Sequence, residues 1–320
     1  MALLKGAIKK MKGSAGEFTF RGNSGRTIVS EKAASVKNVR SAAQQRVRMR
    51  WSNIVQMYKA ISPLIDYGFE DKAQGVTDYN MFVKVNMQMP AVYLKKGDVT
   101  CGACVAAPYI LTKGSIPAIE IFGEGSNCRT NISLGGLVID ESTTVGDFAS
   151  AVIKNKNFKQ DDMISFFSVL QHSNANTGVP YVSATVTSVA LDTESQIPLW
   201  TLVNKAGFTS KNGFLAHGEN EGDGVFCWVH TRKKSDGKLK VSTQSLIDNN
   251  SMLANYTSEH AYYDSVNTYG GERNVALDPT TSGNAARPSS GGNGGTSGGN
   301  GGSTPAPNPS SGDDNTGGVF

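Results

Sequence analysis

Short runs of β-type residues, broken by glycine, asparagine and aspartate, fill most of the chain after Pro90. This texture is typical of a β-sandwich or barrel, because turn residues recur between the short strands. Seven runs are predicted strands: 99–105, 109–112, 117–122, 163–171, 180–191, 224–231 and 238–243. Between them Thr144 is the N-cap of a predicted helix that extends to about Lys154, with Asp147 at its positive end.

The first 90 residues have a different pattern. Residues 17–30 form two alternating runs around Gly22-Asn23-Ser24-Gly25, which predicts a β-hairpin with a glycine-containing loop. Ser41 and Gln44 have the spacing of a capping box, so a helix is predicted to start there and to end at Pro63. Its apolar residues recur at helical spacing: Val47, Trp51, Ile54, Tyr58 and Ile61. Further helices are predicted over 77–89 and 258–269.

The end of the chain has the composition of a flexible segment. The last 39 residues hold 12 of the 36 glycines, with GGNGGTSGGNGG at their centre. Such a segment cannot bury enough surface to offset its ordering entropy. We therefore predict an α+β fold that is mostly β, in three parts: a basic hairpin-helix module (1–90), a β-sandwich-like body of one or two β-domains (91–278), and a disordered tail rich in Gly, Ser, Asn and Pro (279–320).

Charge is divided along the chain. Residues 1–60 contain 13 Lys and Arg against Glu17 and Glu31, whereas the rest contains 18 basic and 25 acidic residues. A basic arm on an acidic body can contact nucleic acid, an anionic surface, or an acidic face of another copy of the protein. No aromatic-rich ribonucleoprotein motif or zinc-finger spacing accompanies these charges, which favours self-assembly over sequence reading.

No motif indicates an enzyme. Cys101 and Cys104 have the spacing of a zinc knuckle or redox pair, but no second pair follows, which favours reduced, buried or half-buried thiols. The one Gly-x-Ser-x-Gly match, at Ser297, lies in the predicted tail, where no nucleophile elbow can form. Phosphate-cradling glycine loops and HExxH are absent. We predict no cofactor, no metal site, no catalytic residue and no small-molecule substrate.

Two further polar segments read as turns. Asp161-Asp162 precedes a predicted strand, and residues 229–241 form a predicted hairpin around Ser235-Asp236-Gly237. The four lysines of that hairpin are expected to be exposed charges that protect a strand edge: Lys233, Lys234, Lys238 and Lys240.

The N-terminal part carries a resemblance. Gly13-Ser14-Ala15-Gly16, the hairpin, and then VKNVRSAAQQRVR at 36–48 are similar to a module in which a glycine-rich hairpin leads into a pattern close to N-P-R-T-x-A-Q-Q-x-x-R and an amphipathic helix. The chain resembles, over about residues 3–200, uncharacterised proteins of Bacteroidota and of phages or mobile elements that form a domain of unknown function. Val39 stands where that pattern has Pro, and Ser41 where it has Thr. The resemblance implies a non-enzymatic role in a phage or mobile-element context.

These observations predict a structural or assembly protein of a larger particle, such as a virion, whose partners are other copies or other particle proteins. Its expected location is the host cytoplasm or the particle, without a signal peptide or a membrane span, since apolar runs are short and the start of the chain is basic. The predicted contact residues are basic: Lys9, Lys10, Lys12, Arg21, Arg26, Arg40, Arg46, Arg48 and Arg50.

Two alternatives use other chemistry. The same basic residues could bind DNA or RNA phosphates, with an affinity that falls steeply with salt. A β-sandwich could also bind carbohydrate through Trp200, Trp228 and nearby tyrosines.

Overall fold

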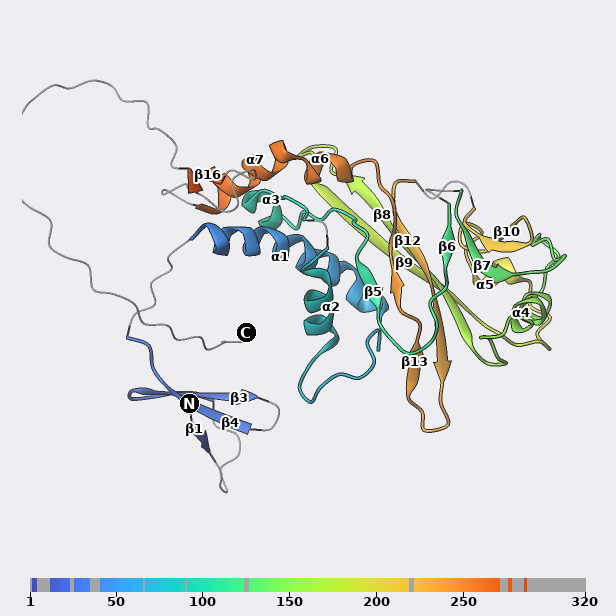
Figure 1. Ribbon diagram of the computed structural model, residues 1–320, viewed down its shortest axis with the longest axis horizontal. Coiled ribbons are helices and arrows are strands. Elements are labelled where there is room, and N and C mark those ends of the chain that lie inside the picture. Colours follow the sequence, from blue (N-terminus) through green and yellow to red (C-terminus); the bar gives the residue numbers. More distant parts are fainter. Residues whose placement is uncertain are drawn as a thin grey trace, which may run out of the picture. The chain divides into compact units, whose positions relative to one another are not determined.

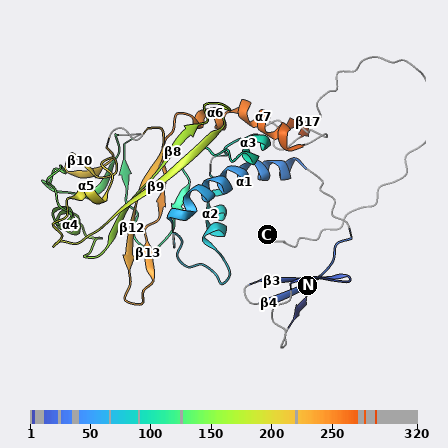
Figure 2. The same cartoon turned by 180° about the vertical axis from the view of Figure 1, so that it is seen from behind.

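A computed structural model shows an α+β fold that is mostly β (Figures 1 and 2). It describes residues 2–4, 12–23, 26–34, 41–65, 67–89, 91–123, 127–218, 222–270, 276–277 and 285–286. These residues all belong to the first of two units of the chain, Met1–Arg287, and the second is Pro288–Phe320. Most of the predicted tail (279–320) therefore lies outside the described residues.

The chain begins with a small antiparallel sheet in the order β1-β4-β3-β2. Its strands are β1 (Ala2–Leu4), β2 (Gly13–Ala15), β3 (Phe18–Asn23) and β4 (Arg26–Glu31). The β3–β4 pair is the predicted hairpin, in register from Phe18 opposite Glu31 to Asn23 opposite Arg26. The glycine-containing loop thus predicted the hairpin, whereas the two short outer strands carry no comparable signal.

Four helical segments follow: α1 (Ala42–Ile61), the 3-10 turn η1 (Ser62–Leu64), α2 (Asp78–Asn86) and α3 (Lys96–Thr100). The predicted capping box is present, because the side chain of Ser41 accepts from Gln44 N and that of Gln44 accepts from Ser41 N. Pro63 lies in η1, where it ends the α-helical hydrogen bonding. Local signals therefore predicted both ends of α1.

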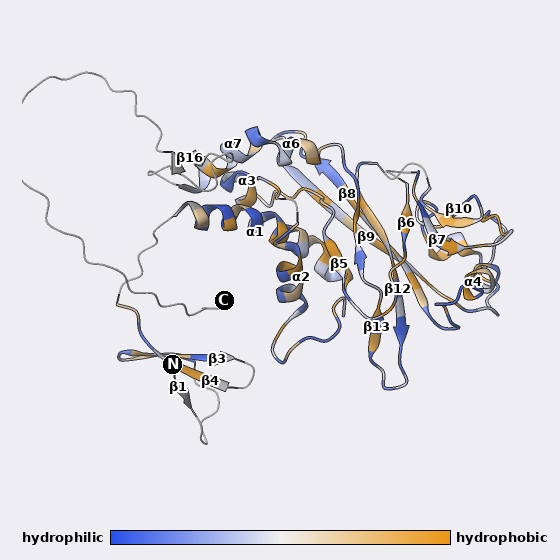
Figure 3. Cartoon of the chain, in the orientation of Figure 1, coloured by the Kyte–Doolittle hydropathy of each residue, from blue (hydrophilic) through white to orange (hydrophobic). Residues whose placement is uncertain are grey.

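The predicted apolar stripe of α1 is wrong in its first half. Val47 and Trp51 are exposed, whereas Met49 and Asn53 are buried. The reason is that Met49 packs against Tyr262 of a C-terminal helix. The buried face of α1 therefore includes polar residues such as Asn53. Figure 3 shows hydrophilic and hydrophobic residues mixed along the helix.

A large sheet forms the centre of the body, in the order β13-β12-β8-β9, with β15 also paired to β12. Its strands are β8 (Met163–Ser173), β9 (Pro180–Ala190), β12 (Gly224–Lys233), β13 (Leu239–Val241) and β15 (Ile247–Asn249). Side chains alternate between two cores. Phe167 and Cys227 face the first, with α1 and α2, while Phe166 and Trp228 face the second.

The second core lies between the large sheet and a smaller sheet in the order β10-β11-β7-β6. The elements on this side are β6 (Ile121–Phe122), β7 (Arg129–Ser133), α4 (Val145–Ile153), α5 (Leu199–Leu202), β10 (Thr209–Lys211) and β11 (Phe214–Ala216). Ile132 and Leu215 of the small sheet meet Phe166 and Trp228 of the large one. This arrangement is the sandwich-like part of the predicted body.

A boundary at residue 90 would divide one hydrophobic core. Ile54 and Met57 of α1 and Phe82 of α2 belong to the same cluster as Phe167 and Val225 of the large sheet. The helices predicted as part of a separate module are therefore one face of the body.

The expected strand at 99–105 is wrong. The chain forms α3 and then has no regular structure from Ala103 to Tyr109, before β5 (Ile110–Thr112) pairs with β14 (Gln244–Ser245). Buried side-chain amides bond the backbone of this segment and of Ile110 directly after it: Asn53, Gln171 and Asn250 on the segment, and Asn86 on Ile110. Asn53, for example, bonds both the N–H and the C=O of Val105 at 2.9 Å. Distant residues thus satisfy the backbone groups that a β-ladder would otherwise pair.

Two helices, α6 (Leu253–Thr257) and α7 (Glu259–Gly270), follow the body. Tyr262 and Val266 of α7 pack on Met49 of α1, and Figure 1 shows these helices side by side. Beyond them β16 (Ala276–Leu277) pairs with β17 (Ala285–Ala286). Regular pairing therefore extends past the predicted end of the folded part near Asp278.

We expect Thr144→Ala to lower the free energy of unfolding by about 1 kcal/mol. The Thr144 side chain accepts from Asp147 N at 3.1 Å, and the Asp147 carboxylate accepts from Thr144 N at 3.0 Å, so the variant removes half of a capping box. Urea unfolding followed by circular dichroism measures the change. Ser150→Ala, at an exposed position of α4, is the control. Equal stability of the two variants would show that the cap contributes nothing.

Candidate functional site

The predicted basic contact residues lie in three kinds of place. Lys12 and Arg21 are exposed in the N-terminal sheet, and Arg50 is exposed on α1. Arg46 and Arg48 are half-buried on α1. Lys9, Lys10 and Arg40 lie outside the described residues, as does the side chain of Arg26, whose backbone belongs to β4. Arg46, Arg48 and Arg50 therefore lie on one helix. Of the predicted contact residues whose side chains the structure describes, Lys12, Arg21 and Arg50 are exposed.

Arg46 is engaged inside the protein. Its Nε donates to the hydroxyl of Tyr262 at 3.3 Å, in an aromatic cluster where the rings of Tyr93 and Tyr262 lie 5.1 Å apart. Burial raises the pKa of Tyr93, an effect that Arg50 and Arg46 partly oppose. Arg46 is therefore partly engaged by α7, and its predicted contact with a partner stays a prediction.

An apolar surface remains uncovered on α1. Val47 and Trp51, one turn apart, are 54% and 46% exposed. Arg50, beside Trp51 in the sequence, is also exposed, and no Asp or Glu occurs between Ala42 and Ile61. We call Val47, Arg50 and Trp51 the α1 patch.

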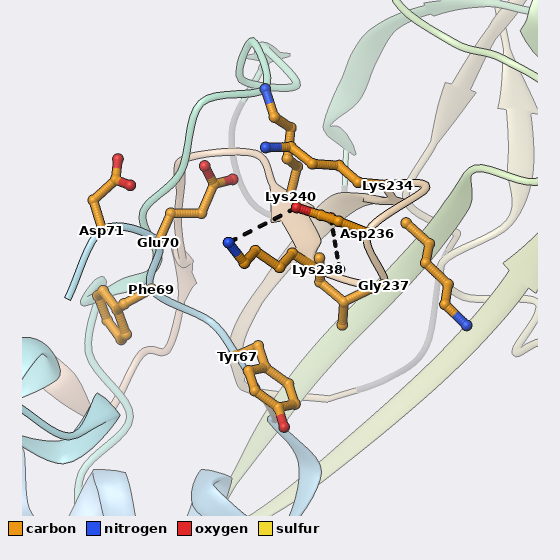
Figure 4. Close-up of a pocket in the computed structure, with 11 residues that line it drawn as sticks. Tyr67, Phe69, Glu70, Asp71, Lys234, Asp236, Gly237, Lys238 and Lys240 are labelled. Atoms are coloured by element: carbon orange, nitrogen blue, oxygen red, sulfur yellow. Dashed lines mark hydrogen bonds and ion pairs between the residues drawn. The ribbon is translucent and has the colours of Figure 1, made fainter.

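A second surface feature is a pocket of about 700 Å³ between residues 67–71 and the tip of the β12–β13 hairpin (Figure 4). Its lining is rich in lysine: Tyr67, Phe69, Glu70, Asp71, Lys233, Lys234, Asp236, Gly237, Lys238, Leu239 and Lys240. We call it the lysine pocket. The hairpin and its charges follow the sequence prediction, and Figure 3 shows the tip in hydrophilic colours. Sequence reasoning missed the opposite wall, because nothing in the pattern connects residues 67–71 to a hairpin far along the chain.

Hydrogen bonds hold both walls of the lysine pocket. The backbone of Gly68 and Glu70 bonds that of Lys113 at 2.9 and 3.0 Å, and Glu70 Oε1 accepts from Val241 N at 2.6 Å. Burial would raise the pKa of Glu70, but bonds from Val241 and Ser115 outweigh it and leave this pKa lowered. In the hairpin, Lys234 N donates to Lys238 O at 2.9 Å. The pocket is therefore held in shape by the protein itself.

A buried charged cluster links Asp162, His230 and Arg232. The Asp162 carboxylate is 2% exposed, lies 2.9 Å from His230 Nε2, and accepts two bonds from Arg232, at 2.7 Å from Nε and 2.6 Å from Nη2. The His230 ring stacks on Phe158 at 4.4 Å between centroids. Sequence reasoning took Asp162 for a turn residue and did not connect it to His230, since the two are far apart in the chain. Because Asp162 and His230 are both buried, we expect this cluster to contribute to the stability of the fold.

Other predicted chemistry can be placed. Cys104, Cys128 and Cys227 are buried and Cys101 is exposed; these four thiols, all within described residues, form no disulfide, and burial raises the pKa of Cys104 to about 12. The part of the chain that the structure describes has no cluster of three or more His, Cys, Asp or Glu placed to hold a metal. The described helices include none with the length and apolarity of a membrane span.

The aromatic platform of the carbohydrate hypothesis does not form. Trp228 is fully buried and donates to Gly207 O at 2.7 Å, so it is a core residue. Trp200 is half-buried, and the Nζ of Lys205 lies 4.4 Å from its ring centroid. A sugar would therefore meet at most one of the two tryptophans.

Comparisons of the chain with protein-family models, curated proteins and solved structures find no match. The family resemblance of the N-terminal module therefore stays a prediction. The functional proposals below rest on the geometry of the α1 patch and of the lysine pocket.

Proposed function

We propose that the protein is a non-enzymatic structural protein of a larger assembly, such as a virion, and that the α1 patch is a contact with a neighbouring copy. The main supporting observation is the exposure of Trp51 and Val47 on a long helix with an N-terminal capping box, beside Arg50. Tryptophan and arginine are the residue types most often found where binding energy concentrates in protein interfaces.

Charge favours another copy as the partner. Beyond residue 60 the chain has 25 acidic against 18 basic residues, so its body offers carboxylates to a helix that has none. Opposite charges of this kind speed association and suppress wrong partners. An apolar centre at Trp51 with Arg50 beside it also matches the usual layout of an interface, in which polar groups surround an apolar core.

The double variant Trp51→Ala/Arg50→Glu is expected to weaken self-association by about 2 kcal/mol or more, which is at least about 30-fold in Kd. Both side chains are exposed, so the fold should be unaffected. Size-exclusion chromatography with light scattering, over a concentration series at low and high salt, measures the oligomeric state.

Two variants control this experiment. Lys59→Glu changes an exposed charge near the other end of α1, and Leu202→Ala removes a side chain that is 48% exposed on α5. Both should assemble like the wild type. A wild type that is monomeric at every concentration and salt, or controls that lose assembly equally, would contradict the proposal.

A specific observation also favours nucleic acid as the second candidate. Trp51 beside Arg50, on a helix without carboxylates, could stack on a base while the guanidinium pairs with a phosphate. The same chromatography with a short DNA duplex and a single strand separates the two. A monomer that shifts only with DNA at low salt, and no longer does so in Trp51→Ala/Arg50→Glu, would favour this candidate over self-assembly.

A further inference from the structure

The lysine pocket has more positive groups than its own carboxylates neutralise. Within the described residues Lys238 has an ion pair with Asp236, at 3.8 Å, whereas no ion pair is formed by Lys233, Lys234 or Lys240. The two other carboxylates are Glu70, which accepts from Val241 N and interacts electrostatically with Lys240, and Asp71, so four lysines face three carboxylates. Figure 4 shows Lys234, Lys238 and Lys240 gathered on the hairpin side, opposite Glu70 and Asp71.

The carboxylate of Asp236 is also committed to its own turn. Its Oδ1 accepts from Lys238 N at 3.0 Å, and Gly237, at φ 80°, completes the turn with a bond to Lys234 O at 3.0 Å. Lys234 and Lys238 therefore project from a backbone that is fixed before any ligand arrives. A cluster of ammonium groups on such a turn is a site for an anion with several oxygens, since each lysine has three donors to offer.

The opposite wall has unusual backbone geometry. Tyr67 and Asp71 have φ values of 58° and 53°, in the left-handed region that bulky side chains rarely adopt. The bonds of Gly68 and Glu70 to Lys113 hold the segment between them. Outliers of this kind concentrate at ligand sites, where surrounding structure maintains them. The Tyr67 ring, which is 63% exposed, lies at the lower edge of the pocket in Figure 4, and the Nζ of Lys72 lies 5.8 Å from its centroid.

We propose that the lysine pocket binds the phosphates of a nucleotide, with the lysines of the hairpin on the phosphate oxygens and Tyr67 stacked on the base. A volume of about 700 Å³ is within the range of small-molecule sites, and it exceeds what a single phosphate needs. Aromatic rings bind any base through its π face, while lysines bind phosphate as point charges. The nucleotide has two sources with the same chemistry, a free molecule or a residue within a nucleic acid strand.

Calorimetric titration of the full chain at low salt tests the proposal with three probes: inorganic triphosphate, adenosine triphosphate and a single-stranded DNA 20-mer. We expect both triphosphates to bind, the nucleotide more tightly. Lys234→Glu/Lys238→Glu should weaken both at least about tenfold, because it replaces two exposed attractive charges with repulsive ones. Lys154→Glu/Lys156→Glu, at exposed positions elsewhere, is the matched control and should bind as the wild type does.

Tyr67→Asn tests the stacking. Asparagine accepts a left-handed backbone more readily than tyrosine, so the wall should keep its shape while the ring is lost. Nucleotide affinity should fall to that of triphosphate, and triphosphate affinity should not change. An unchanged nucleotide affinity would overturn the role of Tyr67.

The remaining outcomes are also decisive. The DNA 20-mer could bind more than tenfold more tightly than the nucleotide. If that binding is lost in Lys234→Glu/Lys238→Glu and kept in Trp51→Ala/Arg50→Glu, the natural ligand is a nucleic acid strand. Tighter binding of the nucleotide assigns the site to the free molecule. Absence of binding by all three probes, or equal losses in the control variant, would overturn the proposal. It does not depend on self-assembly through the α1 patch.

Discussion

Asp162→Asn is expected to lower the free energy of unfolding by about 3–5 kcal/mol, a large share of the stability of an ordinary domain. The carboxylate is almost fully buried and accepts from Arg232, from the Lys159 amide at 2.8 Å, and from His230 when Nε2 carries the proton. The variant leaves Arg232 without its counter-charge and replaces one accepting oxygen with an NH2 group, which cannot accept from Arg232 or His230. Breaking a buried ion pair on one side is costly because the remaining charge loses its partner, and the Arg232 side chain is only 26% exposed.

The same cluster makes stability depend on pH. Burial would raise the pKa of Asp162, but bonds from Arg232 and His230 outweigh it, so this pKa is lowered in the folded protein. The stability that Asp162 contributes is therefore present above its unfolded pKa and is lost as pH falls through the folded one. Burial lowers the pKa of His230 against the opposing effect of Asp162, so protonation of the unfolded chain below about pH 6.5 also favours unfolding.

Urea unfolding at pH 7 and at steps down to about pH 2 measures both effects, because the Asp162 contribution is lost only below its unfolded pKa. The wild type should lose stability as pH falls, and Asp162→Asn should show a smaller loss over the lower part of that range, because its carboxylate can no longer titrate. Glu141→Gln is the control, since Glu141 forms only an exposed ion pair with Lys205 at 3.4 Å. An Asp162→Asn protein as stable as this control at pH 7 would rule out a stabilising role for the cluster.

Asn53→Ala is expected to cost about 3–5 kcal/mol, because it removes the partner of three buried polar groups at once. The Asn53 amide accepts from Val105 N and donates to Val105 O, both at 2.9 Å, and it also donates to the Tyr109 hydroxyl at 2.8 Å. Residues 103–109 belong to no strand, and within the described residues the only hydrogen bonds of Val105 N and O are those to Asn53. The small cavity left by the amide adds to the loss.

Gln56→Ala is the matched comparison on the same helix. Gln56 is half-buried and donates one bond to Val99 O at 3.1 Å, so we expect a loss of about 1 kcal/mol. Denaturant midpoints of the two variants, with equal slopes, give the difference. Similar midpoints would show that the segment does not depend on Asn53, and hydrogen exchange at Val105 N would locate any opening.

Local chemistry determined the features that the sequence predicted correctly. The capping boxes at Ser41 and Thr144 and the turn at Asp236-Gly237 act within a few residues, so their residue types are sufficient to identify them. The exposed lysines of the β12–β13 hairpin belong to the same class. The uneven distribution of charge and the lack of catalytic motifs in the sequence predicted an assembly protein. That function class stays a prediction.

The functional surfaces required contacts between distant residues. Trp51 has the spacing of a core residue, yet it is exposed, because Met49 and Asn53 face the protein instead. Arg46 has the character of a surface residue, yet Tyr262 binds it. Periodicity identifies which residues share a helix face, but it cannot say which face a distant helix will cover.

By itself the sequence determined the fold class, the hairpins, the helix ends and the basic character of the first residues, since propensities, caps and turns depend on neighbours in the chain. Tertiary structure alone decided that residues 103–109 are held by side-chain amides, that Asp162 meets His230 and Arg232, and that residues 67–71 close a pocket against the lysine hairpin. The physical reason is that burial and hydrogen-bond partners are set by segments far apart in sequence, and no local pattern encodes their meeting.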